Sequence, residues 1–259
     1  MNRLLLPGPC EATWPSGVFV KICGVTRVDD ALACVEAGAN FLGLNFHPRS
    51  PRSTTLEQAA AIVAALPATV WPVGVFVEHG PAEVAAIARE VGLRWVQLHY
   101  DAPPASLAPL EGLTVVPAFR LADDASFARM DAFLAHPYSD PADTNDPGRP
   151  YPYRFLLADS LVAGLHGGTG KLIESAALDR LRGDRDHAIC LAGGLNPENV
   201  AERINRLHPL VPYMVDVASG VESSPGRKDP ARVAAFVAAA RQAIKTAASG
   251  SSETSPAVP

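Results

Sequence analysis

The sequence predicts an α/β protein made of a single domain and folded as a (β/α)₈ barrel. Short apolar runs typical of strands alternate with amphipathic segments typical of helices, eight times between residues 18 and 245. Eight such units are the number that closes a parallel sheet into a barrel. The length of 259 residues suits one large domain of this kind, although two small domains would also fit.

An open, doubly wound parallel sheet is the alternative arrangement of the same units. The turn after the first expected strand lacks the G-x-G-x-x-G pattern that marks a dinucleotide-binding sheet. The missing pattern favours the closed barrel.

The first half of the chain has the clearest elements. β-Branched residues alternate with other types over 18–23, which predicts a strand that runs into a turn at Gly24. Gly38 ends the first helix, and Pro81 begins the third. We expect strands at 18–23, 40–46, 70–77 and 94–98, and helices at 28–37, 56–66, 81–91 and, more weakly, 105–110.

The second half continues the alternation around one interruption. We expect strands at 114–119, 155–158, 188–192 and 214–217, and helices at 124–134, 175–181, 198–207 and 230–245. Residues 136–153 are rich in proline and aspartate and follow no period, so they are predicted to be an inserted surface loop. The barrel is expected to occupy residues 18–246, with a disordered extension at 1–17 and a disordered tail at 247–259.

Composition and charge narrow the class of partner. A net charge of −5 gives no basic footprint for nucleic acid or an anionic membrane surface. The apolar stretch 59–77 is interrupted by Pro67 and Pro72, which predicts a helix followed by a strand rather than a membrane span. The four cysteines form neither a C-x-x-C pair nor a zinc spacing, and a chain of this length does not need disulfides, so we expect a cytoplasmic protein.

The expected strand ends carry the candidate chemistry, because functional groups of such barrels lie at the C-terminal ends of the strands. The first strand ends on Cys23 and the sixth on Asp159, which puts a thiol and a carboxylate on roughly opposite sides of one rim. Lys21 faces the same side as Cys23, and a neighbouring ammonium favours the reactive thiolate. The alternative is that Cys23 is a small thiol buried in the core.

Two glycine turns follow the seventh and eighth strands, at Gly193-Gly194 and at Ser219-Gly220. Glycine lets the backbone approach a ligand closely, and phosphate sites recur after these two strands of the barrel. Either turn alone could be an ordinary tight turn. The two together predict a phosphate site.

Other polar segments are predicted to have subordinate roles. The run 167–171 fails as a nucleotide P-loop because residues 165 and 172 are both leucine, and we interpret it as a mobile loop that closes over a substrate. His47 and His99 are expected near the rim as loop or capping residues rather than as metal ligands.

Seven segments resemble the phosphoribosylanthranilate isomerases of tryptophan biosynthesis, in the order in which that family has them. They are KICGVT at 21–26, SPRS at 50–53, GVFV at 74–77, VQLH at 96–99, GGTGK at 167–171, AGGLNPENV at 192–200 and VDVASGVESSPGRKD at 215–229. The resemblance covers residues 18–245, and AGGLNPENV is its most specific segment. It implies a barrel of the phosphate-binding type that catalyses the Amadori rearrangement of N-(5'-phosphoribosyl)anthranilate.

The resemblance also implies a role for each site residue. Cys23 would be the general base and Asp159 the general acid, which must keep its proton near neutral pH. Arg52 would bind the anthranilate carboxylate. The phosphate would be held by amides near Gly193, Gly194, Ser219 and Gly220. No metal and no organic cofactor is implied, and the partners are a small phosphorylated substrate, no nucleic acid and no membrane, in a monomer or a homodimer.

Three departures from the family pattern affect affinity more than reaction type. Ala218 stands where serine is common, Tyr100 where glycine is usual, and Leu172-Ile173-Glu174 replaces a more aromatic segment. Two other functions remain open on the same barrel: the aminoaldose isomerase of histidine biosynthesis, whose relatives use aspartates where this chain has Cys23, and a non-catalytic sugar-phosphate sensor.

Overall fold

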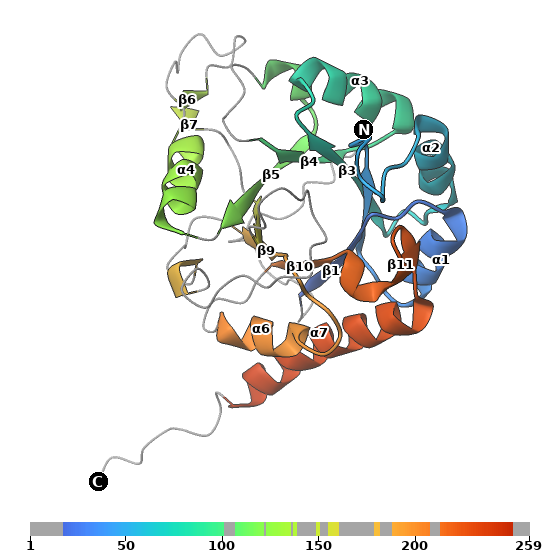
Figure 1. The fold of residues 1–259 in the computed structure, drawn as a ribbon, viewed down its shortest axis with the longest axis vertical. Coiled ribbons are helices and arrows are strands. Elements are labelled where there is room, and N and C mark those ends of the chain that lie inside the picture. The colour runs from blue at the N-terminus through green and yellow to red at the C-terminus, as the bar shows by residue number, and fades with distance from the viewer. Residues whose placement is uncertain are drawn as a thin grey trace.

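The computed structural model describes residues 18–100, 107–121, 123–135, 137–138, 149–150, 155–160, 179–181, 188–207 and 213–250. Its centre is a closed barrel of parallel strands (Figure 1). The barrel strands are β1 (Phe19–Cys23), β2 (Phe41–Asn45), β3 (Trp71–Val77), β4 (Trp95–His99), β5 (Thr114–Leu121), β8 (Phe155–Ser160), β9 (Ala188–Leu191) and β10 (Met214–Val217). The ring closes in the order β1-β10-β9-β8-β5-β4-β3-β2, which confirms the predicted barrel and excludes the open sheet.

Helices surround the barrel, as Figure 1 shows, with α6 and α7 packed beside each other. They are α1 (Val28–Glu36), α2 (Leu56–Ala65), α3 (Pro81–Val91), α4 (Asp124–Leu134), α6 (Val200–Arg206) and α7 (Pro230–Gly250). Local sequence explains their ends: Thr55 and Asp123 form capping boxes with the residues three positions later, and Gly92 closes α3 in the left-handed conformation. Within the described ranges, no helix is long and apolar enough to cross a membrane.

The structure differs from the sequence expectations in several places. The helix expected at 105–110 is only the short turn η1 (Ala108–Leu110) where it is described, and α6 begins two residues later than expected because turns occupy 197–199. Strand β8 continues to Ser160, so that Asp159 lies inside the strand. Helix α7 continues to Gly250, beyond the expected end at 245. The sequence analysis did not anticipate the antiparallel pair β11 (Glu222–Ser224) and β12 (Arg227–Lys228), which follows the turn η2 (Ser219–Val221).

Most of the predicted insertion at 136–153 and both chain ends lie outside the described residues. The described parts of the insertion are β6 (Pro137–Tyr138) and β7 (Arg149–Pro150), which pair antiparallel. The expected loop at 167–171 also lies outside the described residues, and so does most of the helix expected at 175–181. Residues 179–181 of that segment are described and are helical.

The interior of the barrel is filled at its N-terminal end by aromatic side chains. Phe19, Phe41, Trp71 and Trp95 each stand at the first position of a strand, and Tyr213 directly precedes β10. Their rings meet at centroid distances of 5.0 to 6.3 Å. Such contacts add roughly 0.5–1.5 kcal/mol per pair to the effect of apolar burial. This end is therefore a packed core, and any open space must lie toward the other end.

Candidate active site

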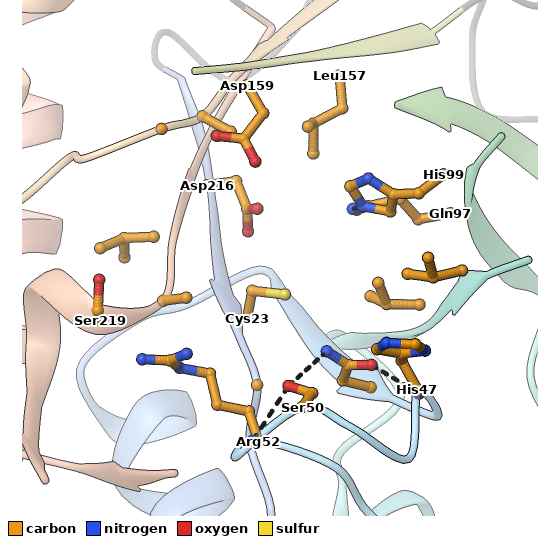
Figure 2. Close-up of a pocket in the computed structure, with 18 of the residues that line it drawn as sticks. Cys23, His47, Ser50, Arg52, Gln97, His99, Leu157, Asp159, Asp216 and Ser219 are labelled. Carbon is orange, nitrogen blue, oxygen red and sulfur yellow. Dashed lines mark hydrogen bonds between the residues drawn. The ribbon is translucent and has the colours of Figure 1, made fainter. Parts of the chain in front are cut away.

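A pocket lies at the C-terminal end of the barrel and takes at least one lining residue from each barrel strand or from the residue directly after it (Figure 2). The space inside it is about 760 Å³ with the open mouth included. Six of the seven predicted site residues line it: Cys23, Arg52, Asp159, Gly193, Gly194 and Ser219. His47 and His99 line it too, which confirms their expected position near the rim.

Cys23 is the last residue of β1, and two glycines explain how its sulfur fits. Gly43 is its register partner on β2, and a Cβ atom at Gly43 would lie 2.8 Å from the sulfur. Gly24 turns the chain out of the strand with a φ of 72°, and a Cβ there would collide with the stem of Arg52. The partly exposed thiol therefore stands at the pocket wall in a space that larger neighbours would close.

Burial and the charged groups around Cys23 shift the pKa of its thiol in opposite directions. Burial raises its pKa, the Lys21 and Lys228 ammonium groups lower it, and the Asp216 carboxylate raises it. The net direction is upward, so that the free enzyme holds this thiol mostly protonated at neutral pH. The lysines are the groups that favour the thiolate when the proton leaves.

Asp159 points into the pocket from β8, where its backbone is in register with Arg120 of β5. The strand order places β10 and β9 between β1 and β8 on one side and four strands on the other. Cys23 and Asp159 are thus near-opposite across the mouth, as expected from the sequence. Figure 2 shows Asp216 of β10 between them, and this second carboxylate was not among the predicted site residues.

The side chains of two asparagines form hydrogen bonds that fix the shape of the first glycine turn. Gly193 and Gly194 have φ angles of 87° and 63°, a left-handed backbone that side-chain-bearing residues rarely adopt. The Asn199 side chain donates a hydrogen bond to the Gly194 carbonyl (3.0 Å), and the Asn196 side chain accepts from the Glu198 and Asn199 amides (3.0 and 2.9 Å). The segment GGLNPEN therefore forms one rigid turn that lines the pocket.

The second turn packs directly against the first. Ser219 lines the pocket, whereas Gly220 is not among its lining residues in the described part of the chain. A Cβ at Gly220 would overlap the carbonyl oxygen of Leu195, and the Gly220 carbonyl accepts a hydrogen bond from Arg232 (3.0 Å). Gly220 thus lets the two turns touch.

Arg52 lines the pocket but already holds a carboxylate of the protein. Its Nε and Nη2 donate to the two oxygens of Glu222 at 2.9 and 2.8 Å, and both side chains are largely buried. Lys228 also donates to Glu222 (2.8 Å) and to the carbonyl oxygens of Cys23 (2.7 Å) and Ala218 (3.1 Å). Arg49, from the same loop, is exposed, with Glu78 as a distant ion-pair partner at 3.7 Å.

Asp216 and Gln97 are pocket groups that sequence reasoning missed. Asp216 forms an ion pair with Lys21, and the Gln97 amide lies 2.7 Å from the His99 ring. The signal that could have found them is period-two alternation: Gln97 and His99, like Lys21 and Cys23, are two apart on one strand and share the inner face. Across the described ranges, no cluster of three or more His, Cys, Asp or Glu side chains is placed to hold a metal ion.

Comparison with known proteins agrees with this geometry. A family model described as N-(5'phosphoribosyl)anthranilate (PRA) isomerase matches residues 20–239. The N-(5'-phosphoribosyl)anthranilate isomerase of Chlorobium chlorochromatii (strain CaD3) is 41% identical over 228 residues, which are 86% of this chain and 97% of the relative.

Solved structures share the fold over the same range. The phosphoribosyl anthranilate isomerase of Thermotoga maritima superposes with a TM-score of 0.71 at 35% identity, over 86% of this chain and 98% of that one. An isomerase of the same kind, in complex with reduced 1-(o-carboxyphenylamino)-1-deoxyribulose 5-phosphate, gives 0.68 at 32% identity with the same coverage. The match of a family model to most of the chain, supported by these relatives, shows that the chain belongs to the N-(5'-phosphoribosyl)anthranilate isomerase family.

Proposed function

We propose that this chain catalyses the Amadori rearrangement of N-(5'-phosphoribosyl)anthranilate to 1-(2-carboxyphenylamino)-1-deoxyribulose 5-phosphate, a step of tryptophan biosynthesis. One observation carries the proposal: a single pocket is lined by Cys23, by Asp159 and by the Gly193-Gly194 turn. A base, an acid and a turn suited to a phosphate are the parts that this reaction needs. Family membership points to the same reaction.

Asp159 is the proposed general acid. In its protonated form it donates its proton to the ring oxygen of the ribose as the bond from that oxygen to the anomeric carbon breaks. The anthranilate nitrogen supplies the electron pair, and an imine forms. Cys23, as the thiolate, then removes a proton from the adjacent sugar carbon, and the resulting enolamine rearranges to the ketone.

Atoms and electrons balance within the substrate, since one proton is given by the acid and one is taken by the base. The proposed mechanism therefore uses neither a metal ion nor an organic cofactor. A well-placed general acid or base contributes typically about 10²–10⁴-fold to the rate of such a step. The location of the two groups near opposite sides of the mouth allows them to act on two different atoms of one bound substrate.

The substrate's phosphate is proposed to bind where the two turns meet. Gly193, Gly194 and Ser219 line the pocket there, and their backbone amides can donate to phosphate oxygens. Gly220 contributes through the close contact of the second turn with Leu195. Ala218, which also lines the pocket, offers no hydroxyl to this site.

Arg52 is proposed to contact the anthranilate carboxylate. Glu222 engages Nε and Nη2 of the guanidinium, and in the described part of the structure Nη1 is the nitrogen left to a ligand. Glu222 thereby fixes the orientation of the planar group, which is a requirement for specific recognition of a carboxylate.

The remaining features of the molecule are part of the same proposal. We expect a monomer or a homodimer; the Thermotoga maritima relative is described as dimeric. We expect a cytoplasmic location, because a thiol base needs a reducing compartment. Residues 1–17 and 247–259 are proposed to be extensions of the barrel, and 136–153 an insertion between α4 and β8.

Turnover of N-(5'-phosphoribosyl)anthranilate by the purified full chain, with a metal chelator present throughout, tests the proposal. We expect conversion to the carboxyphenylamino-deoxyribulose phosphate, detected by chromatography, at a rate unaffected by the chelator. Conversion of the aminoaldose of histidine biosynthesis alone, or tight binding of the substrate without any conversion, would overturn it. Recovery of activity only after a divalent ion is added back would overturn the cofactor-free mechanism.

A further inference from the structure

Lys21 and Asp216 form an ion pair inside the barrel, where Asp216 lines the pocket. The Lys21 Nζ atom lies 2.8 Å from Oδ1 of Asp216, and the side chains are 2% and 10% exposed. The two residues are register partners on β1 and β10, so their side chains enter the barrel at the same height. Cys23 lies two residues further along β1, so its side chain shares the inner face of the strand with Lys21.

The location of this pair is hard to explain by stability. Removing two charges from water costs several kcal/mol per ion, and apolar side chains of similar volume usually serve a core as well or better. Apolar side chains do fill this barrel: Phe41 is the register partner of Lys21 on β2, and Phe19 and Met214 lie two residues before Lys21 and Asp216. Cys23, two residues beyond Lys21, lines the pocket. The pair thus lies at the border between the packed core and the reactive groups.

We propose that Lys21 is a positioning residue that holds its ammonium group between Asp216 and the Cys23 sulfur and so stabilises the thiolate form of the general base. The inference rests on the proposed function, because it assigns Lys21 to the thiol that removes the substrate's proton. An ammonium has three donors and can serve the carboxylate and the sulfur together. Asp216 fixes the ammonium in place and keeps the group cationic.

The electrostatics of the surrounding groups agree with this arrangement. Burial alone would lower the pKa of Lys21, but Asp216, Cys23 and Cys190 hold it above its usual range, so Lys21 stays charged. For the Cys23 thiol, burial raises the pKa, and among the nearby charges Lys21 has the largest effect in the opposite direction. The titratable and charged groups packed around the thiol are Lys21 on β1, Asp216 on β10, Cys190 on β9, Asp159 on β8, Lys228 on β12 and Arg52 in the loop after β2.

The rate at which iodoacetamide alkylates Cys23, measured against pH by mass spectrometry of the Cys23 peptide, tests the proposal without using turnover. In Lys21→Met we expect the pH profile to move to higher pH by at least one unit, which slows alkylation at neutral pH about tenfold or more.

Two further variants guard against trivial effects. Lys21→Met leaves Asp216 as a buried unpaired charge and can unfold for that reason, so the double variant Lys21→Met/Asp216→Asn removes both charges. Its profile should also move to higher pH, but by less than that of Lys21→Met, because the removed carboxylate acts on the thiol in the opposite direction. Lys228→Met is the matched control: Lys228 is another buried lysine near Cys23, but it hydrogen-bonds to the backbone carbonyl rather than to the sulfur. Its profile should move less than that of Lys21→Met.

The proposal is overturned if the folded double variant alkylates like the wild type. It is equally overturned if Lys228→Met shifts the profile as much as Lys21→Met, since that result would describe a general structural loss. These outcomes are independent of the proposed reaction. A wild-type chain that converts the substrate while Lys21→Met leaves the profile unchanged would refute only the role of Lys21.

Discussion

The two ends of the barrel interior are built from the same strands but have opposite chemistry. On β1 the inward-facing residues are Phe19, Lys21 and Cys23, and on β4 they are Trp95, Gln97 and His99. Each strand therefore begins with an aromatic ring, continues with a polar or charged side chain, and ends with a group that lines the pocket. Along each of these two strands, the inward-facing side chains therefore change from core packing to pocket lining over about four residues.

This difference separates stability from chemistry along the barrel axis. The aromatic end buries large rings against one another, and these rings are not among the lining residues that the structure describes for the pocket. The other end keeps a cavity, two carboxylates and a thiol, none of which helps packing. Substitutions at the aromatic end should therefore change the free energy of unfolding, and substitutions at the pocket end should change kcat or KM.

The largest effect is expected at the aromatic end. Phe41 is fully buried and contacts Phe19, Trp71 and Trp95. Phe41→Ala should lower the free energy of unfolding by about 3–5 kcal/mol, measured by urea denaturation, because it removes a ring and leaves a cavity. The fraction that remains folded should keep the wild-type kcat. A tenfold lower kcat in the folded fraction would show that the two ends are not separable.

At the pocket end, Arg52→Ala should weaken binding of an anthranilate-bearing product analogue by about 10–100-fold, the usual value of a charge-assisted hydrogen bond. Inhibition by a bare ribulose phosphate analogue should change much less. Arg49→Ala is the control from the same loop, and since Arg49 is exposed we expect no change in either inhibitor. Equal weakening of both inhibitors by Arg52→Ala would assign Arg52 to the phosphate or to loop structure instead.

Gly43 links the two properties, because its missing side chain makes room for the Cys23 sulfur at the pocket wall. Gly43→Ala puts a Cβ 2.8 Å from that atom, so we expect a loss of about 1–3 kcal/mol in unfolding free energy from overpacking. We also expect kcat to fall about tenfold, since small displacements of reacting groups are costly. Gly80→Ala has open space around the new methyl group and should leave kcat unchanged. An unaltered kcat in Gly43→Ala would mean that the sulfur tolerates displacement.

The smallest effect is expected outside the barrel. Tyr138 and Arg149 are register partners of the pair β6–β7, so a short Gly/Ser link can replace residues 139–148 between them. The free energy of unfolding should change by no more than about 1 kcal/mol, because polar, proline-rich insertions usually tolerate change. A loss of several kcal/mol would show that the insertion packs against the barrel.

Local signals in the sequence were sufficient for the barrel and for most of the pocket. Strand alternation and glycine turns predicted all eight barrel strands, and the strand ends predicted Cys23, Asp159 and the turn at Gly193. The ion pairs were not predictable in this way. Glu222 reaches Arg52 over 170 residues and Asp216 reaches Lys21 over 195, and no local pattern encodes such partners. The contact of Gly220 with Leu195 was not predictable for the same reason, because it depends on how two loops pack.

The central claim is that Cys23 and Asp159 form an acid–base pair at the pocket end. The most direct measurement is kcat for Cys23→Ser and for Asp159→Asn, with urea denaturation of each variant as the check on folding. We expect each variant to unfold within about 1 kcal/mol of the wild type and to lose about 10²-fold or more in kcat. If either folded variant keeps more than about a tenth of the wild-type kcat, the residue it replaces is not the acid or the base, because such a loss is too small for a missing proton donor or acceptor.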